Sequence, residues 1–183
     1  MLQLDVIEPV DEPTEWFSPI VVVPKANGSV RVCVDLTKLN QAVRREVYHM
    51  PTVEEALGSL TEGSVFAKLD ANSGFYQLVL NPESAKLTTL ITPFGRYMFK
   101  RLPFGISSAR EHFQKRMDKE LSGIDGVKCR IYDILVMGKD QAEHDLQLKQ
   151  VLHSVVERRL TLNLEKYLFS QSRLQHLGQI LDI

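Results

Sequence analysis

Two short apolar segments that each carry an aspartate constrain the fold most. The first, VFAKLD at residues 65–70, ends at Asp70, and the second, at residues 127–136, carries Asp133 between two apolar runs. Both have the length and composition of buried β-strands. If the two strands are neighbours in a sheet, their carboxylates come together, and paired carboxylates are suitable ligands for a divalent cation. We therefore expect a sheet that contains both segments.

Turn residues and helix caps divide the chain into hairpins and short helices. The dipeptide Asn27-Gly28, which tolerates positive φ, predicts a hairpin between the apolar runs 20–23 and 30–36. Capping boxes at Thr52 and Ser108 each begin a predicted helix. A helical turn leading into a strand is expected at 75–80 and a turn at Pro82, and the two capped helices should end near 60 and 121. The remaining expected strands are 65–69, 87–92, 97–102, 127–131, 134–137, 161–164, 167–170 and 174–181.

The longest predicted helix follows Asp140, an N-cap residue. Its apolar residues recur at the spacing i, i+3, i+4, i+7 and i+8, which is one face of an amphipathic helix. Residues 6–16, with two prolines and no periodicity, are expected to be an extended lead-in. Hairpins interleaved with capped helices indicate an α+β fold with a mainly antiparallel sheet. The residues of the helical stripe are Leu148, Val151, Leu152, Val155 and Val156.

The composition is compatible with many kinds of protein and does not by itself indicate a function. The 183 residues are 44% hydrophobic and 25% charged, which is ordinary for a soluble globular protein. A net charge of −1 argues neither for nor against nucleic acid, although a nucleic-acid binder usually shows a basic stripe. No apolar run approaches the roughly 20 residues of a membrane span, so no membrane association is expected. Cys33 and Cys129 lie in apolar runs and are predicted to be lone thiols in a reducing compartment.

A series of short motifs resembles the reverse transcriptase domain of gypsy-type long-terminal-repeat retrotransposons over almost the whole chain. Each motif alone is a weak signal, but their shared order and spacing are specific to that family. The motifs are VIEP at 6–9, SPIVVVPK at 18–25, RVCVDL at 31–36, KLDANSGF at 68–75, TPFGRY at 92–97, LPFG at 102–105 and LNLEK at 162–166.

The resemblance implies a right-hand polymerase fold. A lead-in over 1–15 would precede fingers at 16–63 and 84–101, and a palm at 64–83 and 102–183 would hold an antiparallel sheet backed by helices. The thumb is expected to be absent from this chain. In the full-length polyprotein of the element, thumb, ribonuclease H and integrase domains are expected to follow. The implied activity is RNA-directed DNA polymerase, in the cytoplasm and in the context of a virus-like particle.

The same resemblance implies a metal site at the two aspartates. Asp70 and Asp133 match catalytic, metal-binding aspartates, and the backbone carbonyl of Ala71 is expected to be a further ligand. Two Mg²⁺ ions, or Mn²⁺, would clamp the primer 3′-oxygen and the phosphates of an incoming deoxynucleoside triphosphate on an RNA or DNA template. Without the surrounding motif, a strand-end aspartate in a turn would be the better explanation of Asp70.

Further residues match positions that hold the nucleotide. Lys25 and Arg31 would reach its triphosphate, a task that suits the guanidinium fork of arginine. Their alternative is a solvated hairpin face. Phe75 would exclude a 2′-hydroxyl, although plain core packing explains it nearly as well. In addition, Phe104 and Gly105 would lie beneath the sugar and base, and Lys166 aligns with a lysine that protonates pyrophosphate, with an ordinary surface lysine as the alternative.

Tyr132 occupies the position where the family has another catalytic aspartate. A phenol with a pKa of about 10 stays neutral and is a poor ligand for a hard dication. Its ring is also expected to intrude where metal-bound water and the primer terminus should lie. Losing one carboxylate removes several kcal/mol of transition-state stabilisation, or roughly three or more decades of rate. We therefore expect weakened metal binding and an impaired or inactive polymerase.

Other departures point in the same direction. Arg110, Arg130 and Tyr167 replace residues that the family usually has as proline, histidine and cysteine, and each change needs a single base substitution. Two hypotheses follow. The chain is either a polymerase domain with impaired activity, or a non-catalytic relic of the fold that binds nucleic acid or protein.

Overall fold

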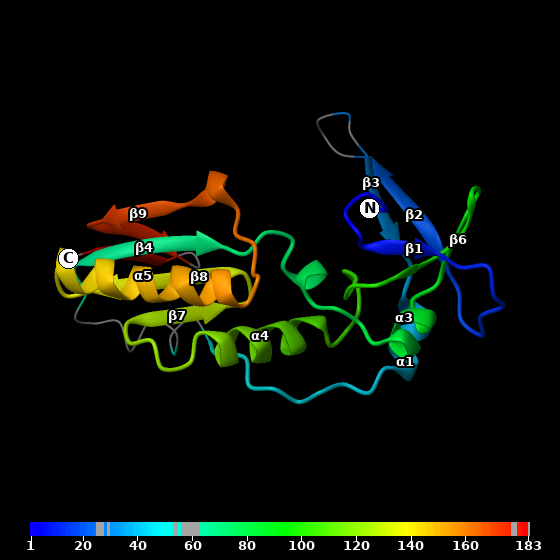
Figure 1. Ribbon diagram of the computed structural model, residues 1–183, viewed down its shortest axis with the longest axis horizontal. Helices are drawn as coiled ribbons and strands as arrows, with labels where there is room; N and C mark the ends of the chain where they lie inside the picture. Colours follow the sequence, from blue (N-terminus) through cyan, green and yellow to red (C-terminus); the bar gives the residue numbers. More distant parts are fainter. Residues whose placement is uncertain (25–27, 29, 53–54, 56–62, 177–178, 183) are drawn as a thin grey trace. The chain divides into compact units, whose positions relative to one another are not determined.

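The computed structural model describes residues 1–24, 28, 30–52, 55, 63–176 and 179–182. The chain divides into two compact units, each made of two separate segments (Figure 1). The first unit comprises Met1–Glu46 and Phe75–Arg110, and the second comprises Val47–Gly74 and Glu111–Ile183.

The first unit is built on a five-stranded sheet with the strand order β1-β6-β5-β2-β3. Strands β2 and β5 are parallel, and the other neighbours are antiparallel. Its elements are β1 (Ile7–Pro9), β2 (Ser18–Pro24), β3 (Val30–Val34), α1 (Thr37–Ala42), α3 (Pro82–Leu87), β5 (Leu90–Thr92) and β6 (Gly95–Phe99), with the 3₁₀-helix η1 (Gly74–Gln77) at its boundary.

A small apolar core holds this first unit together. Val6, Leu90 and Phe99 are buried in one cluster, and Tyr76 and Leu80 pack against it. Pairing of β1 with β6 therefore brings the N-terminal segment into the core. The stretch expected to be an extended lead-in thus includes a short strand of the sheet.

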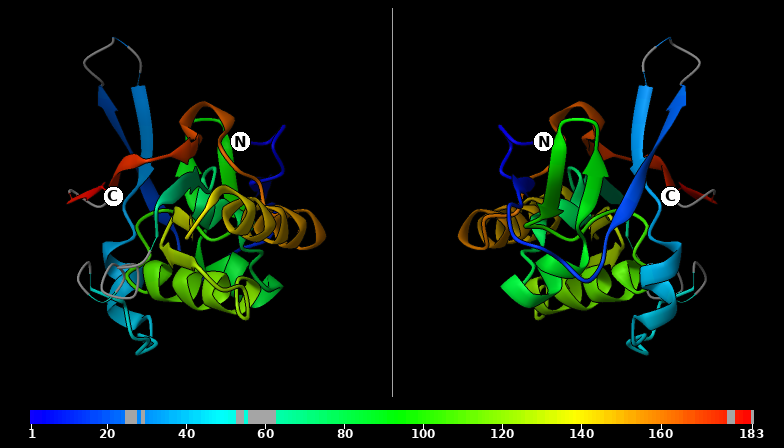
Figure 2. Two further views of the ribbon diagram at one scale, coloured as in Figure 1. Left: turned by 90° about the vertical axis from the view of Figure 1, so that its left-hand side faces the viewer. Right: turned by 90° about the vertical axis from the view of Figure 1, so that its right-hand side faces the viewer.

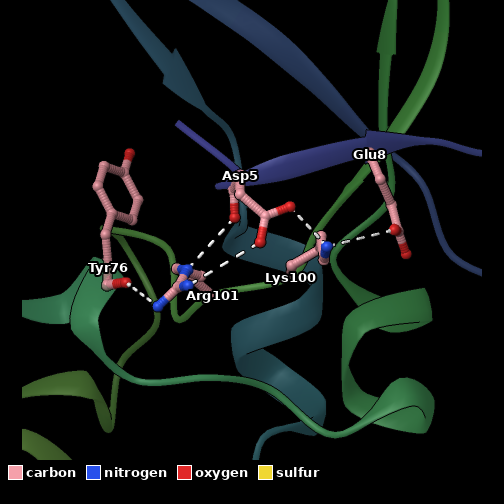
Figure 3. A network of polar contacts seen from close by, with 5 residues as sticks. All are labelled: Asp5, Glu8, Tyr76, Lys100 and Arg101. Carbon is pink, nitrogen blue, oxygen red and sulfur yellow. Dashed lines mark hydrogen bonds and ion pairs between the residues drawn. The ribbon is translucent and has the colours of Figure 1, made fainter. Parts of the chain in front are cut away.

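At the surface, a network of charged side chains links the same N-terminal segment to Lys100 and Arg101 (Figure 3). Lys100 Nζ donates to Asp5 Oδ1 at 2.6 Å and lies 3.8 Å from Glu8 Oε2. Arg101 donates to two backbone carbonyl oxygens, that of Asp5 at 3.2 Å and that of Tyr76 at 3.4 Å. The hydrogen bond from Lys100 lowers the pKa of Asp5, and the same bond raises the pKa of Lys100.

The second unit contains a four-stranded antiparallel sheet with the order β7-β8-β4-β9. Helix α5 packs against β8 and β4, while β10 packs against β4. Figure 2 shows α5 (yellow to orange) on one side of this sheet and the strands β10 and β11 (red) on the other. The elements are β4 (Val65–Asp70), α4 (Ala109–Glu120), β7 (Val127–Arg130), β8 (Asp133–Gly138), α5 (Gln141–Glu157), the 3₁₀-helix η2 (Leu164–Lys166), β9 (Leu168–Gln171), β10 (Arg173–His176) and β11 (Gln179–Asp182).

Strand alternation gives the two faces of β4 different roles. Ala67 and Leu69 are fully buried, as are Ile134 and Val136 on the neighbouring strand. The opposite face carries Phe66, which packs with Leu135 and with Leu174 of β10, and then continues to Lys68 and Asp70. The end of this second face is where the charged residues gather.

Most predicted elements are confirmed, including the mixed α+β fold and the strand pair that carries the two aspartates. The predicted N-cap at Asp140 is also confirmed, because its side chain accepts from Glu143 N at 2.8 Å. Strands β2 and β3 pair as expected, but the hairpin residue Asn27 lies outside the described residues, as does most of the helix predicted over 52–60. The backbone N–H groups of Thr52 and Glu55 do make the reciprocal bonds of a capping box, at 2.8 and 3.1 Å.

Several predictions of local structure were wrong. The run 161–164, predicted to be a strand, contains only the isolated bridge of Leu162 with Ala71, and the strand predicted at 174–181 is two strands, β10 and β11. Pro82 begins helix α3 instead of a turn, because proline suits the first helical position and Asn81 caps it by accepting from Ser84 N at 2.7 Å. Helix α1 was missed, and its N-cap residue Leu36 makes no side-chain cap bond that could have signalled it. The buried stripe of α5 is also rotated, so that it includes His144 and Gln147, while Val156 is 76% exposed.

Among the described residues, no helix combines the length and the apolar composition needed to cross a bilayer.

Candidate active site

The pairing of β4 with β8 places the two aspartates directly opposite each other. The register runs from Val65 opposite Gly138 to Asp70 opposite Asp133. Directly opposed residues of an antiparallel pair project on the same face, with Cβ atoms about 4.5–5.5 Å apart. Two carboxylates that are 63 positions apart in the sequence thus share one end of one sheet face.

Each carboxylate is already bound by a lysine ammonium group. Lys166 Nζ donates to both oxygens of Asp70 at 3.1 Å, and Lys68 Nζ lies 3.0 Å from Asp133 Oδ1. Lys68 precedes Asp70 by two residues on β4 and therefore shares its face, while Lys166 comes from η2. We call these four residues the carboxylate–lysine cluster.

The cluster is only partly accessible to solvent, and unevenly so. The side chains of Asp70 and Asp133 are 15% and 27% exposed, that of Lys68 is 24% exposed, and that of Lys166 is 60% exposed. The pair formed by Lys68 and Asp133 is therefore sheltered on both sides, whereas Lys166 reaches the cluster from solvent.

Backbone hydrogen bonds fix the end of β4. Asp70 O accepts from Asn163 N at 2.8 Å, and Ala71 N donates to Tyr132 O at 2.8 Å. Ala71 itself is buried and forms an isolated bridge with Leu162. The backbone that presents Asp70 is thus tied both to the β7–β8 turn and to the segment before Lys166.

Tyr132 lies in the two-residue turn between β7 and β8, together with Ile131. Its ring centroid is 5.4 Å from that of Phe113 on α4, and a Cβ atom added to Gly74 would lie 2.5 Å from the ring. The structure places the ring against Phe113 and Gly74, and its expected intrusion on a metal position stays a prediction. Only glycine fits at position 74 while the ring keeps this place.

A buried glutamine on α4 holds the same turn. Gln114 is fully buried, and its Nε2 donates to Cys129 O at 2.9 Å and to Asp118 Oδ1 at 2.7 Å. Its Oε1 accepts from Ile131 N at 2.7 Å. Ile131 has φ +55°, a left-handed conformation that a β-branched residue rarely adopts. The amide of Gln114 thus stabilises a strained turn two residues before Asp133.

The cysteine nearest the site is held as a neutral thiol. Cys129 is free, and burial raises its pKa, with the carboxylates of Asp118 and Asp133 adding to the effect. Cys33, in the first unit, is also free, as the sequence predicted.

The residues predicted to hold the nucleotide belong mainly to the first unit. Phe104 packs at a centroid distance of 5.0 Å against both Phe75 and Tyr76. Phe75 is only 6% exposed, as core packing requires, while Phe104 is 45% exposed. Gly105 has φ +101°, so it uses the conformational freedom of glycine. These rings form one cluster.

Of the two predicted triphosphate contacts, only Arg31 belongs to the described residues. Arg31 is opposite Val23 in the β2–β3 pairing, and Lys25 lies outside the described residues. Their roles stay predictions.

Comparison with known proteins identifies the family. The model for "Reverse transcriptase (RNA-dependent DNA polymerase)" matches residues 23–181. The chain is a reverse transcriptase domain. It is 35% identical over 187 residues to the retrovirus-related Pol polyprotein from transposon opus of Drosophila melanogaster, covering 98% of this chain and 18% of that polyprotein. It is also 30% identical over 162 residues to the transposon Tf2-3 polyprotein of Schizosaccharomyces pombe, covering 87% of this chain and 12% of that one.

Solved structures show the same fold. A structure of the foamy viral protease-reverse transcriptase in complex with RNA/DNA hybrid matches with a TM-score of 0.89 at 20% identity, covering 99% of this chain and 24% of that one. The native prototype foamy virus protease-reverse transcriptase matches with a TM-score of 0.88 at 23% identity, with the same coverage. The reverse transcriptase domain described here thus spans less than a fifth of the curated polyproteins that it matches.

The donor set of this reverse transcriptase domain suits a hard divalent cation. Asp70 and Asp133 supply carboxylate oxygens, and each already accepts a cationic group in the form of an ammonium. No cluster of three or more histidine, cysteine, aspartate or glutamate side chains placed to hold a metal occurs in the described part of the chain. Two protein carboxylates are sufficient for Mg²⁺, which keeps several of its own waters.

Two features of the site were missed by sequence analysis. Lys68 could have been found from strand alternation, which places it on the same face as Asp70. Gln114 carries a weaker signal, a polar residue three positions before the buried Met117 on one helix face. Its partners, the backbone groups of the β7–β8 turn, are not visible in any sequence pattern.

Proposed function

We propose that this chain is the fingers-and-palm part of the reverse transcriptase of a gypsy-type retrotransposon. Its reaction would be the transfer of a deoxynucleotide to a primer 3′-hydroxyl on an RNA or DNA template. The observation that supports this most is the register that sets Asp70 opposite Asp133. The fingers would comprise 16–63 and 84–101, and the palm 64–83 and 102–183.

Asp70 and Asp133 would hold Mg²⁺ or Mn²⁺, with the carbonyl of Ala71 as a further ligand. When bound, such ions stabilise the negative charge that develops on the transferred phosphoryl group. The side chain of Gln114 orients the turn that presents Asp133, since it bonds the turn backbone on both sides. The hydrogen bonds from Asn163 N to Asp70 O and from Ala71 N to Tyr132 O hold the end of β4 in the same way.

Further side chains would hold the nucleotide. Lys25 and Arg31 would bind the triphosphate, and Lys166 would donate a proton to the leaving pyrophosphate. Phe75 would exclude a 2′-hydroxyl, while Phe104 and Gly105 would lie beneath the sugar and base. The exposure of Phe104, 45%, leaves its ring available for such a contact.

We also propose that this copy has impaired activity. Tyr132 stands in the turn where the family has another aspartate, and its ring packs on Phe113, so the site keeps two carboxylates. Loss of one carboxylate ligand corresponds to roughly three decades of rate.

Primer extension tests this proposal. The 183-residue chain is incubated with a primed homopolymer RNA template, deoxynucleoside triphosphates and Mg²⁺ or Mn²⁺. We expect weak extension that Asp70→Asn and Asp133→Asn abolish and that Tyr132→Asp raises. Extension as fast as that of an intact reverse transcriptase would refute the impairment, and extension that survives both asparagine variants would refute the active site.

A non-catalytic role is the second candidate. The observation that favours it is that a lysine ammonium already neutralises each carboxylate. In this case the domain would bind a primer–template duplex with a strong salt dependence but without extension. The foamy virus enzyme was solved with RNA/DNA hybrid and with double-stranded DNA, so these two duplexes are the probes to use.

The cellular setting is part of the same proposal. The domain would act inside a polyprotein with thumb, ribonuclease H and integrase domains, in a cytoplasmic virus-like particle. Its relatives are themselves named as transposon polyproteins, which supports this setting.

A further inference from the structure

We propose that Lys68 and Lys166 are built-in counter-ions that set how tightly this domain binds a divalent cation, with Lys68 as the stronger of the two. The inference rests on the proposed function, because it assigns the cation site to Asp70 and Asp133. It goes beyond that function in naming two residues that lower the affinity of the site.

Charge balance within the carboxylate–lysine cluster is the first argument. Two carboxylates carry a charge of −2, and the two ammonium groups that bind them at 3.0 and 3.1 Å carry +2. A divalent cation therefore approaches a cluster with no net charge. The cation must either displace an ammonium group from its carboxylate or bind close to that positive charge. Both alternatives weaken cation binding.

The position of Lys68 makes its ammonium difficult to displace. Lys68 lies on β4 between two paired strands, opposite Leu135 of β8 and Leu168 of β9. Leu135 is fully buried, so the aliphatic stem of Lys68 has a fixed apolar neighbour. Its ammonium reaches diagonally to Asp133, and that pair is about three-quarters removed from solvent on both sides.

The ion pair between Lys166 and Asp70 is weaker than the one between Lys68 and Asp133. Its side chain is 60% exposed, compared with 24% for Lys68. An exposed ammonium is screened by water and salt and can turn away into solvent at little cost. Removal of its charge should therefore change cation affinity less than removal of the charge on Lys68.

Titration of Mn²⁺ into the full 183-residue chain, followed by the electron paramagnetic resonance signal of free Mn²⁺, tests the proposal. The variants are Lys68→Met, Lys68→Gln, Lys166→Met and Asp133→Asn. Lys149→Met is the matched control, because Lys149 is an exposed lysine on α5. Circular dichroism melting establishes that each variant is folded, and the glutamine variant replaces the methionine variant if the latter does not fold.

We expect Lys68→Met to bind Mn²⁺ about tenfold more tightly than the wild type, or more, because a positive charge a few ångströms from a dication is removed. Lys166→Met should show a smaller gain, Lys149→Met no change, and Asp133→Asn a loss. Equal or weaker binding by both Lys68 variants, with loss in Asp133→Asn, would overturn this inference and leave the proposed active site intact. Absence of Mn²⁺ binding in every variant would overturn both.

Discussion

Each of the two units contains a cluster of acidic and basic side chains, and the two clusters differ in how the backbone holds them. In the first unit, Asp5 and Lys100 join two parts of the chain at the surface, and Arg101 binds backbone carbonyl oxygens (Figure 3). In the second, a strand register places Asp70 opposite Asp133 on one face of a sheet. The same side-chain chemistry thus joins two chain segments in one unit and, in the function proposed above, supplies a ligand pair in the other.

Burial separates the two clusters as well. Asp5 is 64% exposed, whereas Asp70 and Asp133 are 15% and 27% exposed. Exposed ion pairs contribute little to stability. A sheltered carboxylate pair held by strand pairing keeps its two carboxylates side by side on one face of the sheet. Substitutions in the two clusters should therefore affect different properties.

The largest expected effect is on activity. Asp133→Asn should lower primer extension by roughly three decades or to the detection limit, because it removes one of two carboxylate ligands. Asp5→Asn, the equivalent change in the first cluster, should leave the rate within about twofold because exposed ion pairs contribute little. Steady-state extension on the same template measures both. A large loss in Asp5→Asn would erase the distinction between the clusters.

The turn before Asp133 should depend on the buried side chain of Gln114. Gln114→Ala leaves Ile131 N and Cys129 O without their partner, and should lower the free energy of unfolding by about 2–3 kcal/mol. Gln150→Ala at an exposed position of α5 is the control, with an expected change within about 0.5 kcal/mol. Urea unfolding measures the difference, and equal effects of the two substitutions would show that the amide does not support the turn.

Packing beneath the turn gives a third prediction. A Cβ atom on Gly74 would lie 2.5 Å from the Tyr132 ring and 2.8 Å from Phe113, so Gly74→Ala should cost about 1–3 kcal/mol of stability. The double variant with Tyr132→Ala should be less destabilised than the sum of the single variants, because removing the ring makes room for the methyl group. Additive effects in the same unfolding assay would place the ring elsewhere.

The smallest expected effect is the pH dependence of the first cluster. The hydrogen bond from Lys100 lowers the pKa of Asp5 in the folded chain below its usual value of 3.8. The stabilisation is therefore fully present above that value and is lost as the pH falls through the lowered pKa. Melting temperatures measured from pH 6 downward should fall less steeply in Asp5→Asn than in the wild type. Asp11→Asn, at another exposed position of the same unit, should keep the wild-type slope.

Much of the second unit was predictable because its strands and caps are local signals. Apolar runs next to an aspartate predicted β4 and β8, and the capping residue Asp140 predicted the start of α5. Strand pairing then follows from the need to bury both runs. The predicted hairpin placed Asp133 in the turn, whereas it is the first residue of β8, a one-residue difference that decides which face it occupies.

Tertiary contacts explain what sequence patterns could not supply. The ring of Tyr132 packs on Phe113 because Gly74 leaves space for it, and nothing near Tyr132 in the sequence indicates that space. Similarly, the apolar stripe predicted for α5 included Val156, but the helix buries His144 and Gln147 instead. Periodicity identifies the helix, while the neighbouring elements choose its buried face.

The most direct test of the account is anomalous diffraction from crystals of the 183-residue chain soaked in Mn²⁺. We predict a peak between the side chains of Asp70 and Asp133, with carboxylate oxygens at about 2.0–2.3 Å, as a hard dication requires. A bound Mn²⁺ elsewhere in the chain, with both aspartates still held by Lys166 and Lys68, would contradict the assignment of this pair as the metal-binding centre of the reverse transcriptase domain.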